Sequence, residues 1–591
     1  MQATEVIAEI ANAHQGSPHV ALDLALQSLD AGADAVKFQV YFAHELLVRS
    51  HPRFAHFKEQ SFSPDEWSYL LHAVKAAGGR VYCDVFGTDA LTVARGEGVD
   101  GFKVHSSDLC NTKLLQNIAA THSSRILLST GGSTAREIAY AINKIGTTRR
   151  PVLLHGFQSY PTSVEDSVLL RIRWLQEHFG RFADIGYQDH VDGSDPFAFT
   201  LPLLAIAMGA QVIEKHVTLD RAAKGVDYYS AMEPTELKEF IKHVRKAETA
   251  LGSRPDVFSQ AERKYRSAMK KHWVAARPLT SGTILSPSEL IIKRVPDNGR
   301  DVVELEQILG RPLLRDLAEE ESISRADVRT LTWVMVVARS RSSRLPGKAL
   351  INMAGIPALQ HLFERLKQIK TVDRIVFCTT LQDDDTPLAQ LAAAVGVSVH
   401  RGPVDDVLGR MLGAMDKRQV DVVVRVTGDD ILVDPEYVEI GLRHHLNSNA
   451  EYSDLKSLPS GTEVEYFDAR ILKQIHRLAK DPDGTEYLTF YVTHHRDQFR
   501  TRTIPVDERH VRPWRLTLDT PEDYEVIRAL LEAMHQKGKS LNYNLDDIVE
   551  FFETHPEILE ANSVGFQQRV PRNINTDIDW SRLLDSRLEG T

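Results

Sequence analysis

Two histidines of this sequence could share one metal ion. His190 directly follows the β-rich run ADIGYQD (183–189), and His216 lies near the end of the next such run, VIEKHV (212–217). Two neutral imidazoles with an open coordination sphere suit a divalent transition metal such as Mn²⁺ or Zn²⁺. Asp227, a little further along the chain, could add a carboxylate.

Cations and hydroxyl groups occur in the same part of the chain. Lys37 and Lys103, with the hydroxyls of Ser106 and Ser129, could bind a phosphate and a carboxylate. A metal beside an anion pocket suits a reaction that polarises a carbonyl group and adds a phosphorylated carbon nucleophile to it. The residues alone therefore indicate a metal-dependent enzyme that acts on an anionic substrate.

A phosphate site of another kind is indicated by the stretch ARSRSSRLPGKAL (338–350). It follows the apolar run WVMVV (333–337), and a strand, a small basic loop and a helix are a common way to hold nucleotide phosphates. The spacing is not that of a Walker loop. The cations are Arg339, Arg344 and Lys348, while Ser342, Ser343 and Gly347 would let backbone N–H groups approach an anion.

Two carboxylates could complete this second site. Asp429 lies in RVTGDD (425–430) and Asp519 in WRLTLDTPEDY (514–524), each at the end of a predicted strand. Carboxylates that meet a phosphate loop would bind Mg²⁺, a hard cation that prefers oxygen ligands.

The elements that must position the first group alternate between β-rich runs and helical patterns. Eight such units in about 250 residues predict a (β/α)8 barrel, with an open doubly wound sheet as the alternative. In a barrel the polar residues named above would share the rim formed by the C-terminal ends of the strands. The runs are VIAEIA (6–11), AVKFQV (35–40), VYCDVF (81–86), GFKVHS (101–106), ILLSTG (126–131), PVLLHGF (151–157), ADIGYQD and VIEKHV.

The predicted secondary-structure pattern changes twice in the rest of the chain. A charged stretch, SQAERKYRSAMKK (259–271), predicts a linker helix, and residues 272–330 have the short strands and Gly and Pro turns of a small β-rich module. From 331 to 560 the β–α rhythm returns and predicts an open, Rossmann-like α/β domain. The predicted domains are thus 1–258, 272–330 and 331–560, followed by a polar C-terminal tail, 561–591.

The totals exclude several classes of protein. The 591 residues exceed what one core supports, and the net charge of −11 argues against a nucleic-acid binder. Three cysteines without metal-ligand spacing argue against a disulfide framework and favour a reducing compartment. With no signal peptide and no apolar stretch near the ~20 residues that span a bilayer, we expect a cytoplasmic protein without membrane contact.

The barrel motifs resemble the N-acetylneuraminate synthase family, in order and over the whole predicted barrel. The 272–330 module resembles that family's C-terminal antifreeze-like (SAF) domain. The resemblance implies condensation of phosphoenolpyruvate with an N-acyl hexosamine, or a related sugar, to a nine-carbon 2-keto acid. It is carried by IAEIANAHQG (7–16), AGADAVKFQ (31–39), GFKVHSSD (101–108), LLSTGG (127–132), YPTS (160–163), GYQDH (186–190) and EKHVTLDRAAKGVDYYSAMEP (214–234).

The same resemblance implies roles for single residues. It puts the metal on His190 and His216, with Mn²⁺ or a similar ion. Arg294 would reach from the SAF domain into the barrel of a partner subunit, which implies a domain-swapped homodimer. Phosphoenolpyruvate would contact Lys37, Lys103, Ser106 and Ser129, and the sugar would contact Glu9 and Asp227. The catalytic residues would be Glu9, Lys37, Lys103 and Asp227, with Asp108, Gln158 and Tyr160 as further substrate contacts.

Several positions depart from the family pattern and leave the acyl groups of the sugar open. The usual Asn-His is Ala13-His14 here, the usual Ser-Gly-Glu is Ser106-Ser107-Asp108, an Asn is Gln158, and the Ser before Asp-His is Gln188.

Residues 333 to about 555 resemble the SpsF-like cytidylyltransferases, which are related to synthetases of CMP-activated keto sugars. The resemblance implies that Arg339, Arg344 and Lys348 grip the triphosphate of CTP, with Arg401 as a further nucleotide contact, and that Asp429 and Asp519 hold Mg²⁺. Asp430 and Ile431 replace a usual Asn or Cys and a usual Pro. The motifs are ARSRSSRLPGKAL, RGPVDDVLGR (401–410), VRVTGDD (424–430), GTEVEYF (461–467), TEYLTFYVTHH (485–495) and LTLDTPEDY (516–524).

Together these resemblances predict a bifunctional enzyme that makes a nonulosonic acid and activates it to the CMP-sugar. Two alternatives stay open. The same architecture could make a different or non-acylated 2-keto-3-deoxy sugar acid, or one half could act only as a binding or dimerisation module.

Overall fold

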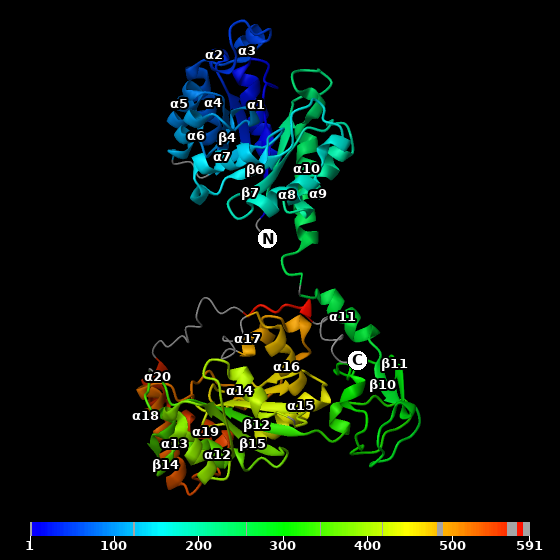
Figure 1. The fold of residues 1–591 in the computed structure, drawn as a ribbon, viewed down its shortest axis with the longest axis vertical. Helices are drawn as coiled ribbons and strands as arrows, with labels where there is room; N and C mark the ends of the chain where they lie inside the picture. Colours follow the sequence, from blue (N-terminus) through cyan, green and yellow to red (C-terminus); the bar gives the residue numbers. More distant parts are fainter. Residues whose placement is uncertain are drawn as a thin grey trace. The chain divides into compact units, whose positions relative to one another are not determined.

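The computed structural model describes residues 3–121, 125–255, 257–342, 344–416, 418–480, 488–563 and 576–582. The chain forms two compact units, residues 1–253 and 254–591, which are described one at a time (Figure 1). In the described residues no helix is both long and apolar enough to cross a membrane.

The first unit is a closed barrel of eight parallel strands. Each strand pairs with the next in chain order, and β1 pairs with β8 to close the sheet. The strands are β1 (Glu5–Glu9), β2 (Ala35–Val40), β3 (Val81–Val85), β4 (Gly101–Val104), β5 (Arg125–Ser129), β6 (Val152–His155), β7 (Asp184–Asp189) and β8 (Val212–Val217), with a short β9 (Ala231–Met232) beside β8. The predicted barrel is confirmed, and all eight β-rich runs contain a strand.

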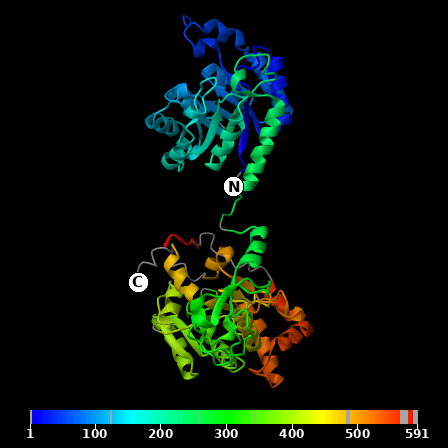
Figure 2. The same cartoon turned by 90° about the vertical axis from the view of Figure 1, so that its right-hand side faces the viewer.

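Helices surround this barrel, and Figure 2 shows α10 as the long helix along its flank. Their starts follow local chemistry: Ser63 and Glu66 form a capping box on α4, as Thr134 and Glu137 do on α7. The helices are α1 (Pro18–Asp30), α2 (Ala43–Leu46), α3 (Phe54–Gln60), α4 (Pro64–Ala76), α5 (Thr88–Gly96), α6 (Thr112–Ala119), α7 (Ala135–Ile145), α8 (Leu170–Phe179), α9 (Phe197–Ala207) and α10 (Pro234–Leu251).

Strand alternation decides which side chains point into the barrel. Ile7 and Leu154 belong to an apolar cluster that fills its middle. Two residues further along β1, Glu9 faces the same way as Ile7 and pairs with Lys37 on β2 and His216 on β8. The polar layer therefore lies above an apolar plug, at the C-terminal ends of the strands.

The second unit begins with α11 (Gln260–Met269), the predicted linker helix, and continues into the small β-rich module. The module has one antiparallel pair, β10 (His272–Ala275) with β11 (Leu290–Lys293), and a core of its own built around residues such as Leu285 and Ile308.

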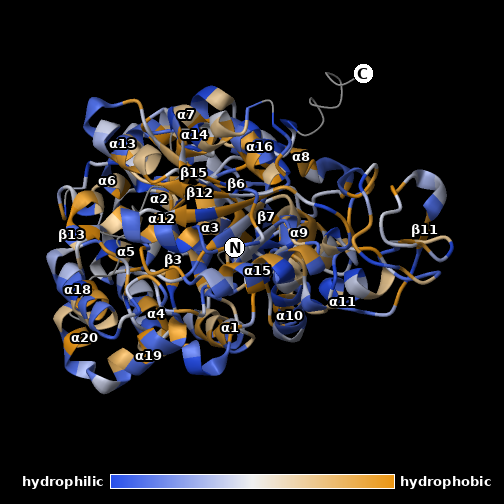
Figure 3. Cartoon of the chain, turned by 90° about the horizontal axis from the view of Figure 1, so that it is seen from below, coloured by the Kyte–Doolittle hydropathy of each residue, from blue (hydrophilic) through white to orange (hydrophobic). Residues whose placement is uncertain are grey.

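The rest of the second unit is a seven-stranded mixed sheet with helices packed around it. The strand order is β16-β15-β12-β17-β19-β18-β20, in which β16, β15, β12 and β17 are parallel and β19 runs antiparallel to β17. Figure 3 shows the hydrophobic colour on β12 and β15, the buried centre of this sheet. The strands are β12 (Thr332–Val337), β15 (Arg374–Thr380), β16 (Ser398–Gly402), β17 (Val422–Thr427), β18 (Tyr452–Asp454), β19 (Glu465–Asp468) and β20 (Thr501–Thr503), with β13 (Asn352–Met353) and β14 (Ile356–Pro357) as a separate pair.

Helices α12 (Ala358–Leu366), α13 (Thr386–Ala394) and α14 (Val407–Ala414) follow the first strands as the sequence predicts. The remaining helices are α15 (Pro435–Asn447), α16 (Ala469–Leu478), α17 (Leu488–Thr493), α18 (Pro521–Gln536), α19 (Leu545–Thr554) and α20 (Pro556–Ser563).

One expectation for this unit needs correction. Residues 516–519 form no strand; the segment has a single bridge, from Ser460 to Arg515, and leads directly into α18. The described part of the polar tail, 576–582, packs on the domain, because Ile578 joins its core and bridges to Ala479. The rest of the tail, except for the end of α20, lies outside the described residues.

The small module is bound firmly to the sheet. Arg325 is buried and donates to Asp468 Oδ2 at 3.3 Å, while Arg311 forms a bidentate pair with Asp421, with both contacts at 2.6 Å. Asp421 precedes β17 and Asp468 ends β19. The module therefore contacts these two neighbouring strands at the same edge of the sheet, where β17 begins and β19 ends. The predicted domain boundaries stay predictions.

Candidate active sites

Five charged side chains meet in the barrel interior. Lys37 forms an ion pair with Glu9, Lys103 contacts Glu214 at 2.6 Å, and Lys37 lies 3.6 Å from Glu214. Asp84 lies between the two ammonium groups, at 3.8 and 3.9 Å. All five side chains are buried. The structure thus brings Glu9, Lys37 and Lys103 together as the sequence predicts.

Asp84 and Glu214 are the members of this cluster that sequence reasoning missed. Each is a charged residue inside an apolar run, VYCDVF or VIEKHV, and a charge in a buried strand is the signal that could have found it. Burial lowers the pKa of Lys37 to about 8, although Glu214 and Asp84 oppose that shift. The cluster can offer two ammonium groups to an anion.

Two imidazoles lie side by side at the end of the barrel. The ring centroids of His190 and His216 are 5.0 Å apart, and the ring of Tyr160 stands edge-on to both, at 5.6 and 5.8 Å. Both ring nitrogens of His190 are buried without a hydrogen-bond partner. Burial, followed by the charge of Lys103, lowers the pKa of His190 to about 4, so the ring is neutral at physiological pH.

Burial also lowers the pKa of His216. The two imidazoles fit a transition metal, because neutral rings, and in His190 ring nitrogens without a hydrogen-bond partner, are what such an ion takes from histidine. Among the described residues no group of three or more His, Cys, Asp or Glu side chains is gathered for a metal.

Ser129 is hydrogen-bonded by Gln188, the residue that replaces the usual Ser before Asp-His. The side-chain amide of Gln188 donates to Ser129 Oγ and to the carbonyl of Gly156, each at 2.7 Å. Gly156 has a φ of +123°, and a Cβ there would lie 2.1 Å from the carbonyl oxygen of Gln188. The glycine is what allows Gln188 to reach Ser129.

The loop after β4 forms a second polar chain. His105 Nε2 contacts Gln158 Oε1 at 2.5 Å and His105 Nδ1 contacts Ser107 Oγ at 2.9 Å. Asp108 accepts from Ser107 and Asn111, so both of its oxygens are engaged within the loop. Ser106 begins this same short helical turn, directly after His105.

Asp227 lies in a left-handed conformation, φ 60°, before the turn that leads to β9. Burial raises the pKa of its carboxyl, and a hydrogen bond from the backbone of Asn12 opposes the shift. Arg294 belongs to the second unit, where it is exposed directly after β11.

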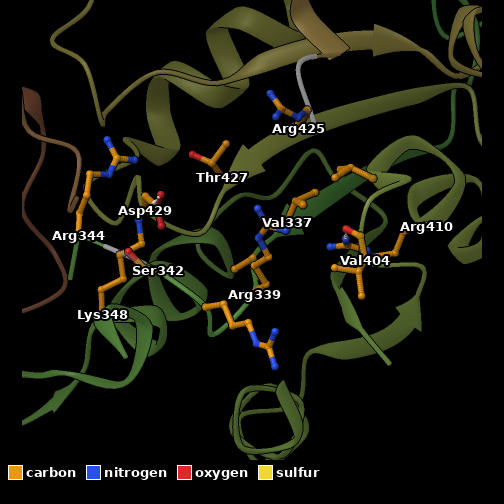
Figure 4. A pocket seen from close by; sticks show the side chains of 13 residues that line it. Val337, Arg339, Ser342, Arg344, Lys348, Val404, Arg410, Arg425, Thr427 and Asp429 are labelled. Atoms are coloured by element: carbon orange, nitrogen blue, oxygen red, sulfur yellow. Dashed lines mark hydrogen bonds and ion pairs between the residues drawn. The ribbon is translucent and has the colours of Figure 1, made fainter. Parts of the chain in front are cut away.

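The second candidate site is organised around Lys348. Its ammonium contacts Asp429 at 2.6 Å and Asp519 at 2.7 Å, and Arg344 contacts the other oxygen of Asp519 at 2.8 Å. Figure 4 shows Arg344, Lys348 and Asp429 together on one side of a cleft, with Arg339 nearer its centre. Two carboxylates that converge on one cation have the oxygen donors that Mg²⁺ prefers.

Three distant segments position this group. Lys348 follows β12 by way of the basic loop, and Asp429 comes directly after β17, which is the neighbour of β12. Asp519 reaches them because Leu518 donates its backbone N–H to the carbonyl of Asp429 at 2.9 Å. Of the predicted phosphate loop, Ser343 lies outside the described residues.

The cleft has more cations than the sequence motifs suggested. Arg341, Arg410 and Arg425 line it with Arg339, Arg344 and Lys348. Arg425 pairs with Glu465 at 2.6 Å, and the side chain of Arg410 donates to the carbonyls of residues 403 and 404. Arg401 does not line this cleft; it donates to the carbonyls of Thr380 and Gln382 and so ties β16 to the loop after β15.

Two further carboxyls lie behind Asp429. Burial raises the pKa of Asp430 to about 6, and Asp429 adds to this shift. Burial also raises the pKa of Glu463 to about 8, with Asp430 as the next cause. Asp430, the other departure in this motif, is thus electrostatically coupled to a second acid, Glu463.

Three family models match successive parts of the chain. Residues 24–256 match the NeuB family, residues 273–329 match the SAF domain and residues 333–548 match the cytidylyltransferase model.

Curated relatives divide in the same way. An uncharacterized protein of Methanocaldococcus jannaschii is 31% identical over 322 residues, which cover 54% of this chain and 93% of that protein. The N,N'-diacetyllegionaminic acid synthase of Campylobacter jejuni is 30% identical over 349 residues, 55% of this chain and 99% of that protein. The spore coat polysaccharide biosynthesis protein SpsF of Bacillus subtilis is 29% identical over 229 residues, 38% of this chain and 94% of that protein.

Proposed function

The chain belongs to the NeuB family of synthases and carries a SAF domain and a cytidylyltransferase domain in the same polypeptide, and from this premise we propose a two-step activity. The barrel condenses phosphoenolpyruvate with an N-acyl hexosamine or a related sugar to a nonulosonic acid. The second unit then activates this acid with CTP. The observation that carries the proposal is the pair of buried ammonium groups, Lys37 and Lys103, in the barrel whose rim holds two neighbouring imidazoles.

In the barrel, Lys37 and Lys103 bind the phosphate and carboxylate of phosphoenolpyruvate, assisted by Ser106 and Ser129. Binding requires the two ammonium groups to exchange part of their contact with Glu9 and Glu214 for the substrate. Gln188 orients Ser129 through its 2.7 Å hydrogen bond. The sugar lies on the open side and contacts Glu9, Asp108, Gln158, Tyr160 and Asp227.

His190 and His216 would hold a divalent ion such as Mn²⁺, which supplies Lewis-acid polarisation of the sugar carbonyl. C3 of phosphoenolpyruvate attacks that carbonyl carbon, water adds at C2, and phosphate leaves as the 2-keto group forms. Glu9 accepts a hydrogen bond from the backbone N–H of Ala11 at 2.8 Å, and this fixed carboxylate supports its proposed role as a sugar contact.

In the second unit, Arg339, Arg344 and Lys348 bind the triphosphate of CTP. Asp429 and Asp519 would hold Mg²⁺, which neutralises charge on the phosphates. The anomeric hydroxyl of the keto acid attacks the α-phosphorus, pyrophosphate leaves, and the hydroxyl proton passes to solvent. Catalysis here is positioning and charge neutralisation. Arg401 stays a predicted nucleotide contact, although its guanidinium is engaged elsewhere in the structure.

We place this activity in the cytoplasm and in a homodimer in which Arg294 reaches the partner's barrel. The exposure of Arg294 directly after β11 is compatible with that contact.

The test supplies the full chain with phosphoenolpyruvate, Mn²⁺, Mg²⁺, CTP and a panel of hexosamines, and identifies products by mass spectrometry. His216→Ala should abolish phosphate release while pyrophosphate release from added keto acid survives. Asp519→Ala should do the reverse. A CMP-linked product without acyl groups would change the assigned sugar, and a chain that releases neither phosphate nor pyrophosphate with any sugar would refute the proposal.

A further inference from the structure

Asp84 lies between the two ammonium groups on which the proposed barrel reaction depends. Its carboxylate is 3.8 Å from Lys37 Nζ and 3.9 Å from Lys103 Nζ, and its side chain is inaccessible to solvent. Neither carboxylate oxygen has a hydrogen-bond partner. A buried carboxylate in this state is held only by charge.

The other two carboxylates of the cluster behave differently. Glu214 accepts a hydrogen bond from Lys103 at 2.6 Å and so occupies one of its N–H donors, while Glu9 forms a close ion pair with Lys37. At 3.8 to 3.9 Å a hydrogen bond is lost, but the Coulomb attraction in a buried site persists. Asp84 therefore attracts both ammonium groups without occupying the donors of either.

We propose that Asp84 is a positioning residue of the phosphoenolpyruvate site, the shared counter-ion that lies between Lys37 and Lys103 and attracts both ammonium groups while leaving their N–H donors available to the substrate. The inference rests on the proposed function of the barrel. Asp84 touches no reacting atom and acts only through the two lysines.

The balance of charges around Lys37 supports this role. Burial lowers the pKa of Lys37 to about 8; Glu214 and Asp84 raise it and Lys103 lowers it. Without Asp84, Lys37 would lose its proton at a lower pH, and an ammonium group that has lost its charge no longer attracts phosphate. The titratable groups that face or adjoin Asp84 are Lys37 on β2, Cys83 on β3, Lys103 on β4, Glu214 on β8, Glu9 on β1 and Tyr160.

The experiment measures phosphoenolpyruvate binding to the full chain with Mn²⁺ by titration calorimetry at pH 7 and pH 9. Wild type should bind more weakly at pH 9, because Lys37 deprotonates through about pH 8. Asp84→Asn should bind within about twofold of wild type at pH 7 and about tenfold more weakly at pH 9, a downward shift of about one pH unit. Asp84→Glu should restore the wild-type profile.

Two further variants serve as controls for this experiment. Asp84→Ser removes the charge without burying an amide and should repeat the pH 9 loss if the asparagine variant folds poorly. Glu5→Gln changes a carboxylate that pairs with Arg125 among the side chains at the N-terminal ends of the strands and should leave the pH profile unchanged.

Equal weakening of Asp84→Asn at both pH values would show a merely structural role, and no change at pH 9 would show that Asp84 does not support the charge. Either result, with wild-type binding intact, overturns the role of Asp84 alone. A wild type that binds no phosphoenolpyruvate at either pH overturns the proposed function as well.

Discussion

Leu518 donates its backbone N–H to the carbonyl of Asp429 at 2.9 Å, and this bond brings Asp519 beside Asp429 although no strand connects them. Lys348 then contacts both carboxylates. The second site is thus assembled from three segments that share no sequence motif.

Lys348→Met should disable the second step alone. Removing the ammonium group leaves Asp429 and Asp519 facing each other and removes a phosphate contact, so KM for CTP should rise at least about tenfold and kcat should fall. Pyrophosphate release measures this, and phosphate release by the barrel should not change. Lys367→Met is the control, because Lys367, at the C-terminal end of α12, forms its ion pair with Glu364 of that helix. An unchanged KM for CTP would contradict the role of Lys348.

Gly156→Ala should damage the first step. The added Cβ would meet the carbonyl oxygen of Gln188, displace its amide from Ser129, and raise KM for phosphoenolpyruvate. Gly132→Ala is a matched control, since Gly132 also has a positive φ, +64°, but a Cβ there meets nothing within 4 Å. Both variants carry backbone strain, so equal effects on KM would mean that strain and not Gln188 is responsible.

Glu463→Gln should make the second unit less sensitive to alkali. The folded pKa of Glu463 is raised to about 8, so the folded state holds a proton that the unfolded chain has already lost above its ordinary value of 4.5. Stability is then lost as pH rises from about 4.5 to about 8. The Tm of the glutamine variant minus the Tm of wild type should therefore be larger at pH 8 than at pH 5. A constant Tm difference would exclude this titration.

Arg325→Met should separate the small module from the sheet. It removes the buried guanidinium from Asp468, which keeps its contacts with Gln307 at 2.8 Å and Arg470 at 3.0 Å. The second unit should therefore lose less than the ~3–5 kcal/mol that an uncompensated buried charge costs, measured by denaturant unfolding, with the barrel transition unchanged. Arg329→Met is the exposed control, because its pair with Asp373 should contribute about 0–1 kcal/mol. Equal losses would show that Arg325 is no anchor.

The sequence by itself determined the barrel and the α/β domain with helices α12, α13 and α14 after its first strands. It also determined that the lysines and histidines of the barrel lie toward one rim. Strand periodicity is local, and a parallel barrel brings the C-terminal ends of all its strands to one rim, so Lys37, Lys103 and His216 could be placed without coordinates.

Only the tertiary structure decided the rest. The sequence shows Asp84 and Glu214 as charges inside apolar runs, but only the closed barrel places them against two ammonium groups. Arg401, expected to contact the nucleotide, donates instead to the carbonyls of Thr380 and Gln382. Asp519 joined Asp429 through one backbone hydrogen bond between an irregular segment and a strand end. Which charge meets which depends on long-range closure and strand register, and no local pattern encodes either.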